Sequence, residues 1–351
     1  MRLIFYKAPL ISRLVIFIVL PLFVILGFIY QSVFIDTLPV LNSETTHVDI
    51  RDNVTISRDE HGIPVIRAHH DEDVFFAMGY VHAQDRLWQL ELQRRLARGT
   101  LSEVFGSETI EQDIWYRTLD LYTSAENSIR HLSPDVRNSL EQYAAGINTF
   151  LRESHALPVE FSVLGVEPEP WTIVDSLVWS KIFALNLGGN YRQEIQRYLA
   201  SQYLSASQFN FLFSKEAPEK NTAKQYAENT VFADLLSLNL SQEHEWNVGG
   251  KYVGSNAWAV SGKFTDDGMP IIANDPHLGL QLPSLWYGVK QVGKNINSTG
   301  MSLVGMPLVI FGRNERISWA GTNMMADVQD IVIEQLHPGN AALYKSGEQW
   351  L

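Results

Sequence analysis

The first part of the chain is marked by one long apolar run. Leu14 to Tyr30 (LVIFIVLPLFVILGFIY) contains no charged or strongly polar side chain, and this length is just enough to cross the core of a bilayer. Basic residues precede the run and acidic residues follow it, which predicts that the rest of the chain lies outside the cytoplasm. No pair of small residues suited to signal cleavage follows the run. We therefore expect an uncleaved anchor in the inner membrane over residues 14–30, with a signal sequence as the alternative.

The next 160 or so residues carry mostly helical periodicity. Residues 31–50 are expected to form a tether, and two short alternating runs around turn residues predict a β-hairpin over 54–68. A long helix is predicted over 71–98, because its first turn is acidic, its last turn is basic and Gly99 follows it. Its apolar stripe consists of Phe75, Met78, Val81, Leu87, Leu90 and Leu92. Further helices are expected at 134–151 and 174–200, joined by a proline-rich loop over 157–171.

The pattern changes twice after residue 213. Residues 214–250 are polar and charged around one short apolar run, which predicts the least stable part of the chain outside the anchor. Strand patterns follow, each bounded by Gly, Asn, Asp or Pro. They cover 255–262, 269–274, 285–292, 308–312, 317–321 and 330–336. A helical first part and a strand-rich second part predict an α+β fold.

Composition narrows the class of protein. The 351 residues are 46% hydrophobic and 11% aromatic, which indicates a globular chain with one large domain or two smaller ones. The net charge of −12 disfavours contact with a phosphate backbone, so no nucleic-acid partner is expected. The absence of cysteine excludes disulfides, thiolate metal ligands and a cysteine nucleophile. Covalent catalysis would have to use oxygen or nitrogen.

Ser255 is the candidate nucleophile. It opens an alternating strand (SNAWAVSG) directly after the polar segment, and Asn256 and Trp258 are expected to pack that strand. No G-x-S-x-G motif surrounds a serine, so a conventional Ser-His-Asp triad has little specific support. If the bond before Ser255 is cut, its own α-amine, with an unperturbed pKa near ~7.7, supplies a base on the same residue.

Several ordered blocks resemble the penicillin acylase family of N-terminal nucleophile hydrolases. They are GSNAWAVSGKFT, NDPHLGL at 274–280, FGRNERISWAGTN at 311–323, the block 58–106 that starts RDEHGIPVIRA, and LPVEFSVLGVEPEPWT. The resemblance spans about residues 50–335. Agreement of several blocks in order is far more specific than the tripeptide GSN alone.

The resemblance implies a precursor that cuts itself between Gly254 and Ser255. It divides the chain into residues 1–30 (signal or anchor), 31–50 (tether), 51–213 (α-subunit region), 214–254 (removable spacer) and 255–351 (start of the β-subunit). Ser255 would then attack an amide carbonyl. The backbone N–H of Asn323 matches an oxyanion donor, and His277 matches a position that orients the nucleophile and its amine. After cleavage the two fragments would remain together as a heterodimer.

The resemblance also implies one structural Ca²⁺ ion. Glu194, Asp327 and Asp330 match ligand positions in the family, and the carbonyl of Gln329 matches a main-chain ligand. Such an oxygen-only ligand set suits Ca²⁺.

The fold that the resemblance implies is a four-layer αββα sandwich, incomplete here because the chain stops within the β-subunit region. The second oxyanion asparagine and the remaining calcium ligands are expected beyond Leu351.

Three functions are weighed. The first is a self-processing amidohydrolase that acts on carbon–nitrogen bonds of linear amides other than peptide bonds. Its substrate would be a β-lactam side chain, as in antibiotic metabolism, an acyl-homoserine lactone or an acylated peptide. The second is a membrane-tethered, non-catalytic binding protein that keeps the fold. The third is a conventional serine hydrolase, which would be active as an uncut chain.

Overall fold

The computed structural model describes residues 9–47, 49–153, 157–213, 254–324, 326, 328–332 and 334–351. The predicted spacer, residues 214–254, lies outside the described residues except for Gly254. The chain divides into two compact units. Unit 1 comprises Met1–Ser180 and Gln281–Ala320, and unit 2 comprises Lys181–Leu280 and Gly321–Leu351. Each unit therefore contains residues from both sides of the 254–255 bond. The division into an α-subunit region, a spacer and a β-subunit region remains a prediction.

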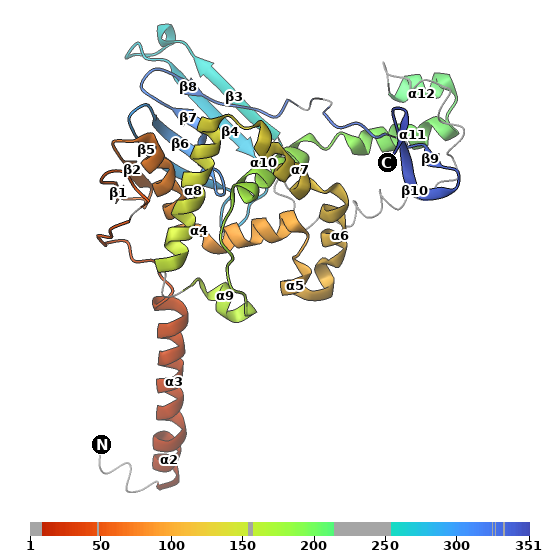
Figure 1. Ribbon diagram of the computed structural model, residues 1–351. Coiled ribbons are helices and arrows are strands. Elements are labelled where there is room, and N and C mark those ends of the chain that lie inside the picture. Colours follow the sequence, from red (N-terminus) through yellow and green to blue (C-terminus); the bar gives the residue numbers. More distant parts are fainter. Residues whose placement is uncertain are drawn as a thin grey trace. The chain divides into compact units, whose positions relative to one another are not determined.

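The apolar run near the N-terminus is helical, as predicted (Figure 1). The helical turns follow one another without a gap as α2 (Pro9–Leu14), η1 (Val15–Val19), α3 (Leu20–Tyr30) and η2 (Gln31–Ile35). The stretch Leu10–Ile35 is apolar and long enough to cross a membrane, and its most apolar window is not buried against the rest of the protein. The helix ends five residues later than the predicted anchor, because Val33, Phe34 and Ile35 continue its apolar character.

A six-stranded sheet joins the N-terminal hairpin to strands from the second half of the chain. Strands β1 (Thr55–Arg58) and β2 (Pro64–Arg67) form the predicted antiparallel hairpin. Strand β2 then pairs in parallel with β5 (Trp286–Val292). The sheet continues antiparallel through the next three strands, in the order β1-β2-β5-β6-β7-β8. Those three strands are β6 (Asn297–Leu303), β7 (Val309–Arg313) and β8 (Ser318–Trp319).

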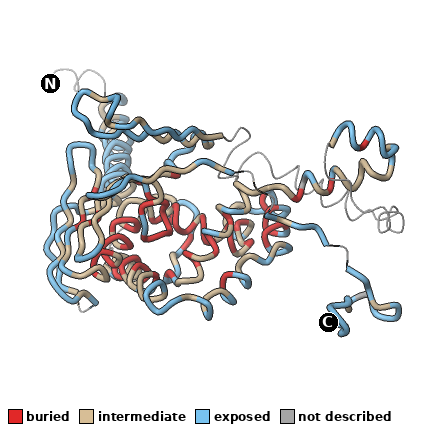
Figure 2. Tube along the Cα trace, turned by 90° about the horizontal axis from the view of Figure 1, so that it is seen from above, coloured by how far each residue is buried: buried red, intermediate tan, exposed pale blue. Residues whose placement is uncertain are grey.

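The core of unit 1 is built on the crossing of two long helices, α4 (Asp71–Arg98) and α8 (Pro134–Glu153), which lie side by side in Figure 1. Helix α4 has the predicted bounds, and Gly99 ends it with a left-handed φ of 62°. Met78, Val81, Leu87 and Leu90 of the predicted stripe are buried, whereas Phe75 and Leu92 are only half-buried. Figure 2 shows that buried residues concentrate on helical turns in the interior, whereas the outer turns and strands are mostly exposed or intermediate.

Two glycines allow α4 and α8 to approach closely. A Cβ on Gly79 would overlap the carbonyl oxygen of Tyr143, and a Cβ on Gly146 would overlap that of Phe76. The two backbones are thus in direct contact, and any larger residue at either position forces them apart.

His82 of α4 is a buried polar link between this crossing and the sheet. Its Nδ1 lies 2.7 Å from the hydroxyl of Tyr143, and its Nε2 lies 3.3 Å from the hydroxyl of Ser302 in β6. Complete burial, reinforced by the nearby charge of Arg86, lowers the pKa of His82 to about 3. The ring is therefore neutral at physiological pH and serves as a hydrogen-bonding spacer.

Shorter helices complete the helical part. One helix was expected over 174–200, but the structure has α10 (Ile173–Gly188) and α11 (Tyr191–Tyr203). The break occurs because Gly189 adopts a left-handed φ of 55°, which ends α10. The others are α5 (Ser102–Phe105), η3 (Gly106–Thr109), α6 (Ile110–Leu119), α7 (Leu121–Ser128), η4 (Ile129–His131), α9 (Val159–Leu164) and α12 (Ala206–Leu212).

The strand-rich second part is confirmed, with local corrections. In unit 2, β3 (Gly254–Val260) and β4 (Ile271–His277) form an antiparallel pair, and η6 (Gly262–Phe264) lies in the connection between these two strands. The remaining strands are β9 (Leu336–His337), β10 (Asn340–Ser346) and β11 (Gln349–Trp350). The protein is therefore a mixture of helices and sheets.

Several details of the strand prediction are wrong. Of the described residues in the strand expected over 330–336, only Leu336 is in a strand. The N–H of Ile331 donates to the carboxylate of Glu194 in place of a neighbouring strand. Strand β6 was missed because its sequence, NSTGMSL, lacks apolar alternation. Trp258 is 56% exposed, so it does not pack the strand as expected.

Replacing Gly146 with alanine tests the helix crossing. We expect Gly146→Ala to lower the free energy of unfolding by about 3 kcal/mol, because the added methyl group overlaps a backbone carbonyl that cannot rotate away. Urea denaturation followed by circular dichroism measures the change. Glu141→Ala, an exposed position on the same helix, is the control and should stay within about 0.5 kcal/mol of the native protein. Equal stability of the two variants would contradict the close approach.

Candidate active site

Ser255 lies near the start of β3, where the hairpin with β4 positions it. In the register of this pair, Gly254 faces His277 and Ser255 faces Pro276. Both Gly254 and Ser255 are half-buried, whereas the next four residues of the strand are exposed. The bond predicted to be cut therefore sits at the end of a two-stranded ladder, with its serine side partly shielded from solvent.

The backbone of Asn323 meets the hydroxyl of Ser255. The Asn323 N–H donates to Ser255 Oγ at 3.2 Å, across 68 residues of sequence. The Asn323 side chain donates through Nδ2 to the carbonyl oxygen of Leu187 at 2.7 Å. Leu187 is in the last turn of α10, where carbonyl groups lack helical partners. The helix end thus fixes the asparagine whose N–H points at the serine.

Asn274 links the hairpin to the segment that carries Asn323. Its Nδ2 donates to the carbonyl oxygens of Asn256 at 2.9 Å and Gly321 at 3.0 Å. Its Oδ1 accepts the N–H of Gly321 at 3.1 Å. The Asn274 side chain therefore pairs with both the N–H and the carbonyl group of Gly321, as a neighbouring strand would. Gly321 lies two residues before Asn323, whose N–H meets Ser255. Sequence reasoning did not single out Asn274, although it lies in the quoted block NDPHLGL.

His277 lies against the glycine that precedes the serine. Its Nδ1 is 3.6 Å from the position that a Cβ on Gly254 would occupy. Its Nε2 lies 2.7 Å from Oδ2 of Asp275, and both side chains are largely exposed. A carboxylate at Nε2 favours the tautomer in which Nε2 carries the proton, which leaves a lone pair on Nδ1 next to Gly254. Among the described residues, no hydrogen bond joins Ser255 Oγ to a histidine.

Sequence reasoning missed Asp275. A usable signal was present, because residues two apart in a strand share a face, so Asp275 and His277 in β4 are neighbours by period alone.

Of the residues expected to bind calcium, Glu194 contacts the segment that carries Gln329 and Asp330. Glu194 of α11 accepts the N–H of Ile331 through Oε2 at 2.7 Å. Asn190 holds the same segment, donating to the carbonyl oxygen of Gln329 at 2.7 Å and accepting the N–H of Val328 at 3.2 Å. Asp330 lies between these contacts and is exposed, and Asp327 lies outside the described residues. Within the described part of the chain, no three acidic, histidine or cysteine side chains form a ready metal site.

The arrangement suits attack by a serine hydroxyl on a carbonyl carbon. A backbone N–H already lies at Ser255 Oγ, and a histidine with an oriented ring lies at the preceding residue. In the intact chain the nitrogen of Ser255 is an amide and cannot act as a base. The geometry is thus suited first to a reaction at the Gly254 carbonyl itself.

Comparisons with known proteins agree with the blocks read from the sequence. The model of the penicillin amidase family matches residues 53–351. The acyl-homoserine lactone acylase QuiP of Pseudomonas aeruginosa is 31% identical to the chain, over 90% of this chain and 38% of that protein. The penicillin acylase 2 proenzyme of a Pseudomonas species is 30% identical, over 85% of this chain and 40% of that protein. The chain thus spans about two fifths of the length of these curated relatives.

Solved structures also match the chain. A thermostable penicillin G acylase from Alcaligenes faecalis is 27% identical and matches 48% of this chain and 95% of that chain, with a TM-score of 0.40.

Removing the charge of Asp275 tests the His277 geometry. We expect Asp275→Asn to slow cleavage of the 254–255 bond by about tenfold, because the ring loses the carboxylate that sets its tautomer. Gel electrophoresis over time, with masses of the fragments, measures the rate. Asp266→Asn, an exposed acid in the connection between β3 and β4, is the control. A rate equal to that of the control would show that Asp275 does not position the ring.

Proposed function

The chain belongs to the penicillin amidase family, and from this we propose that it is a self-processing amidohydrolase whose nucleophile is Ser255. The observation that carries the proposal is the hydrogen bond from the Asn323 N–H to Ser255 Oγ. The oxyanion forms on the oxygen of the attacked carbonyl group, which lies next to Oγ during the attack, so a donor beside Oγ is within reach of it.

Self-cleavage is the first reaction. Ser255 Oγ attacks the carbonyl carbon of Gly254 and gives up its proton. The carbon–nitrogen bond then breaks, the nitrogen of Ser255 takes a proton, and Gly254 is left as an ester on Oγ. Water hydrolyses this ester, which releases a chain that begins at Ser255 with a free α-amine. The region before the cut and the region after it would remain together as a heterodimer.

Turnover uses the product of that cleavage. The α-amine of Ser255, with an unperturbed pKa near ~7.7, accepts the hydroxyl proton as Oγ attacks a linear amide. An acyl-enzyme forms, the amine leaves with the proton, and water releases the acid. The Asn323 N–H stabilises the oxyanion in both halves, and losing such a donor commonly costs ~3 kcal/mol. His277 orients the nucleophile and its amine.

The substrate class is an N-acyl amide in which the bond cut is not a peptide bond. Two relatives support this class, one named an acyl-homoserine lactone acylase and the other a penicillin acylase. A β-lactam side chain, an acyl-homoserine lactone and an acylated peptide all belong to it. The fold that suits this chemistry is the four-layer αββα sandwich of N-terminal nucleophile hydrolases.

One structural calcium ion is proposed at the junction between α11 and residues 327–330. Glu194, Asp327, Asp330 and the carbonyl of Gln329 would hold it. The donors fit in kind, because they are all oxygen atoms, and Glu194 already contacts this segment at the N–H of Ile331. When bound, the ion would link helix α11 to the segment that follows Asn323. It would thus stabilise the site without taking part in the reaction.

Export to the periplasmic side is proposed from the helix Leu10–Ile35, which is long and apolar enough to cross a membrane. Uncleaved, this helix would anchor the enzyme in the inner membrane with the site outside the cytoplasm.

Replacing the nucleophile tests the proposed function. The full-length protein should yield two fragments, the second beginning at Ser255, and should hydrolyse a chromogenic phenylacetyl or acyl amide. Ser255→Ala should remain uncut and inactive, because no hydroxyl attacks Gly254. Ser261→Ala, a serine later in the same segment, is the control and should cleave normally. A native protein that stays uncut and inert would instead favour a non-catalytic binding protein.

Calcium is tested by stability. We expect chelation to lower the midpoint of thermal unfolding by several degrees, and added Ca²⁺ to restore it, because the ion binds only the folded state. Glu194→Gln should lose most of this response, whereas Glu141→Gln, an exposed acid on α8, should keep it. A melting temperature of the native protein that does not change on chelation would contradict the calcium proposal.

A further inference from the structure

A separate cavity of about 510 Å³ lies in unit 1. Its walls include Arg58, Asp85, Arg86, Trp286 and Tyr287, and none of its lining residues belongs to the candidate active site. A volume in this range is typical of sites for small molecules. The wall combines aromatic and proline side chains with charged groups. The net charge of these groups therefore decides which class of ligand the cavity can bind.

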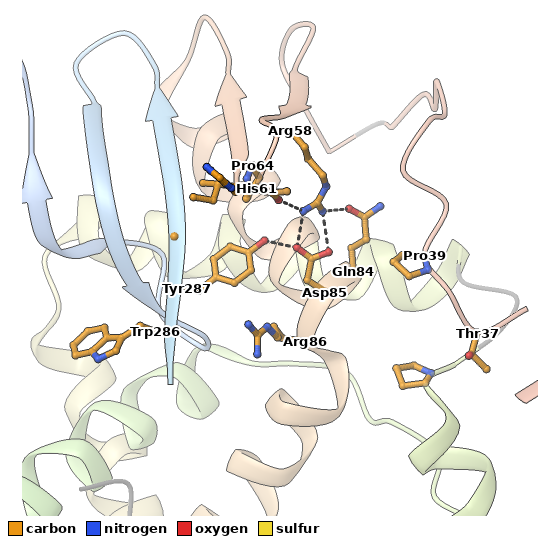
Figure 3. Close-up of a pocket in the computed structure, with 14 residues that line it drawn as sticks. Thr37, Pro39, Arg58, His61, Pro64, Gln84, Asp85, Arg86, Trp286 and Tyr287 are labelled. Carbon is orange, nitrogen blue, oxygen red and sulfur yellow. Dashed lines mark hydrogen bonds and ion pairs between the residues drawn. The ribbon is translucent and has the colours of Figure 1, made fainter. Parts of the chain in front are cut away.

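Two of the three charged groups neutralise each other. The Arg58 guanidinium donates to both carboxylate oxygens of Asp85 at 2.8 Å, and also to Gln84 and the carbonyl of Gly62 (Figure 3). The hydroxyl of Tyr287 donates to Asp85 Oδ2 at 2.5 Å. Burial, followed by the charge of Asp85, raises the pKa of Tyr287, which keeps this hydroxyl protonated. Both carboxylate oxygens of Asp85 are therefore engaged by Arg58 and Tyr287, and among the described residues no ion pair joins Asp85 to its neighbour in sequence, Arg86.

Among the described residues, the charge of Arg86 has no acidic partner, and its guanidinium group faces the ring of Tyr287. Helix α4 is interrupted at this residue, which has a non-helical φ of −143° and ψ of 28°. The guanidinium carbon lies 5.9 Å from the centre of the Tyr287 ring, and Figure 3 shows the group apart from the Arg58–Asp85 pair. In the described part of the chain, no hydrogen bond or ion pair engages the half-buried Arg86 side chain. A half-buried cation without an acidic partner favours an anionic ligand.

The rim of the cavity indicates where that ligand comes from. Thr37 and Pro39 line it, and they follow almost directly on the apolar helix that ends at Ile35. If this helix crosses a membrane as proposed above, the rim lies at the level of the lipid headgroups. Trp286 in the wall is a residue type enriched at that level.

We propose that this cavity binds the phosphate diester of a phospholipid headgroup. The guanidinium of Arg86 donates to the phosphate oxygens, and Trp286 packs against the adjoining glycerol carbons. One negative charge on the diester balances the one unpaired positive charge of the wall. The proposal rests on the membrane placement, but not on catalysis by Ser255. Bound lipid would hold the rim of unit 1 against the bilayer surface.

Titration of the full-length protein in a non-ionic detergent tests the proposal. Dihexanoylphosphatidylglycerol supplies the lipid phosphate, inorganic phosphate supplies the free ion, and dihexanoylglycerol supplies the lipid without phosphate. Isothermal calorimetry should show binding of the first, with Arg86→Gln at least about tenfold weaker, because a charge-assisted hydrogen bond is lost. Arg316→Gln, an exposed arginine of the same unit, is the control and should bind as the native protein does.

Each other outcome overturns the proposal in a defined way. Binding of dihexanoylglycerol as tight as that of the phospholipid would show that phosphate is not recognised. Inorganic phosphate binding as tightly as the lipid would make this a site for the free ion. Unchanged lipid affinity in Arg86→Gln would remove the assigned donor. If Arg86→Gln does not fold, Trp286→Ala decides, since it should weaken the phospholipid and leave weak binding of inorganic phosphate unchanged. Self-cleavage is scored in the same samples, so failure of this site and failure of the Ser255 chemistry are distinguishable.

Discussion

The hydrogen bond between the Asn323 N–H and Ser255 Oγ is the contact on which the functional account depends. It requires β3, β4 and the segment after β8 to be held together at the end of α10. Asn274 and the side chain of Asn323 do this with four hydrogen bonds to backbone groups. The serine is therefore positioned by side-chain amides acting in place of a continuous sheet.

Unit 1 depends on a different constraint. The close approach of α4 and α8 at Gly79 and Gly146 brings His82 within hydrogen-bonding distance of both Tyr143 and Ser302. Since Ser302 is in β6, this buried network connects the helix pair to the sheet. The Arg58–Asp85 pair adds a second connection, from β1 to α4, and Tyr287 extends it to β5. These polar links are satisfied, which is what allows them to be buried.

Much of the local structure could be predicted from sequence, because it depends on neighbouring residues. The bounds of α4 followed from its charged ends and Gly99, and the β1–β2 hairpin followed from its turn residues. The helix break at Gly189 was missed, because a left-handed glycine between two helical patterns is easily read as part of one helix. Strand β6 was missed because its pairing with β5 and β7 replaces the apolar pattern it lacks.

The site shows the same limit. Ser255, Asn323 and His277 came from ordered sequence blocks, and the structure brings Asn323 to Ser255 and His277 to Gly254. Asn274 acts through tertiary contacts that no periodicity encodes, whereas Asp275 was missed although its position two residues before His277 in β4 places both side chains on one face. The parallel pairing of β2 with β5 and the cavity beside it join residues more than 200 positions apart, which local patterns do not predict.

The most direct measurement of the central claim is the site of acylation. The purified full-length protein is mixed with a slowly hydrolysed amide, quenched in acid and mapped by peptide mass spectrometry. The account predicts that the acyl group is found on the hydroxyl of a serine that begins a chain, with a free amine on the same residue. An acyl group on a polypeptide still continuous from Gly254 to Ser255, or on any other residue, would contradict it.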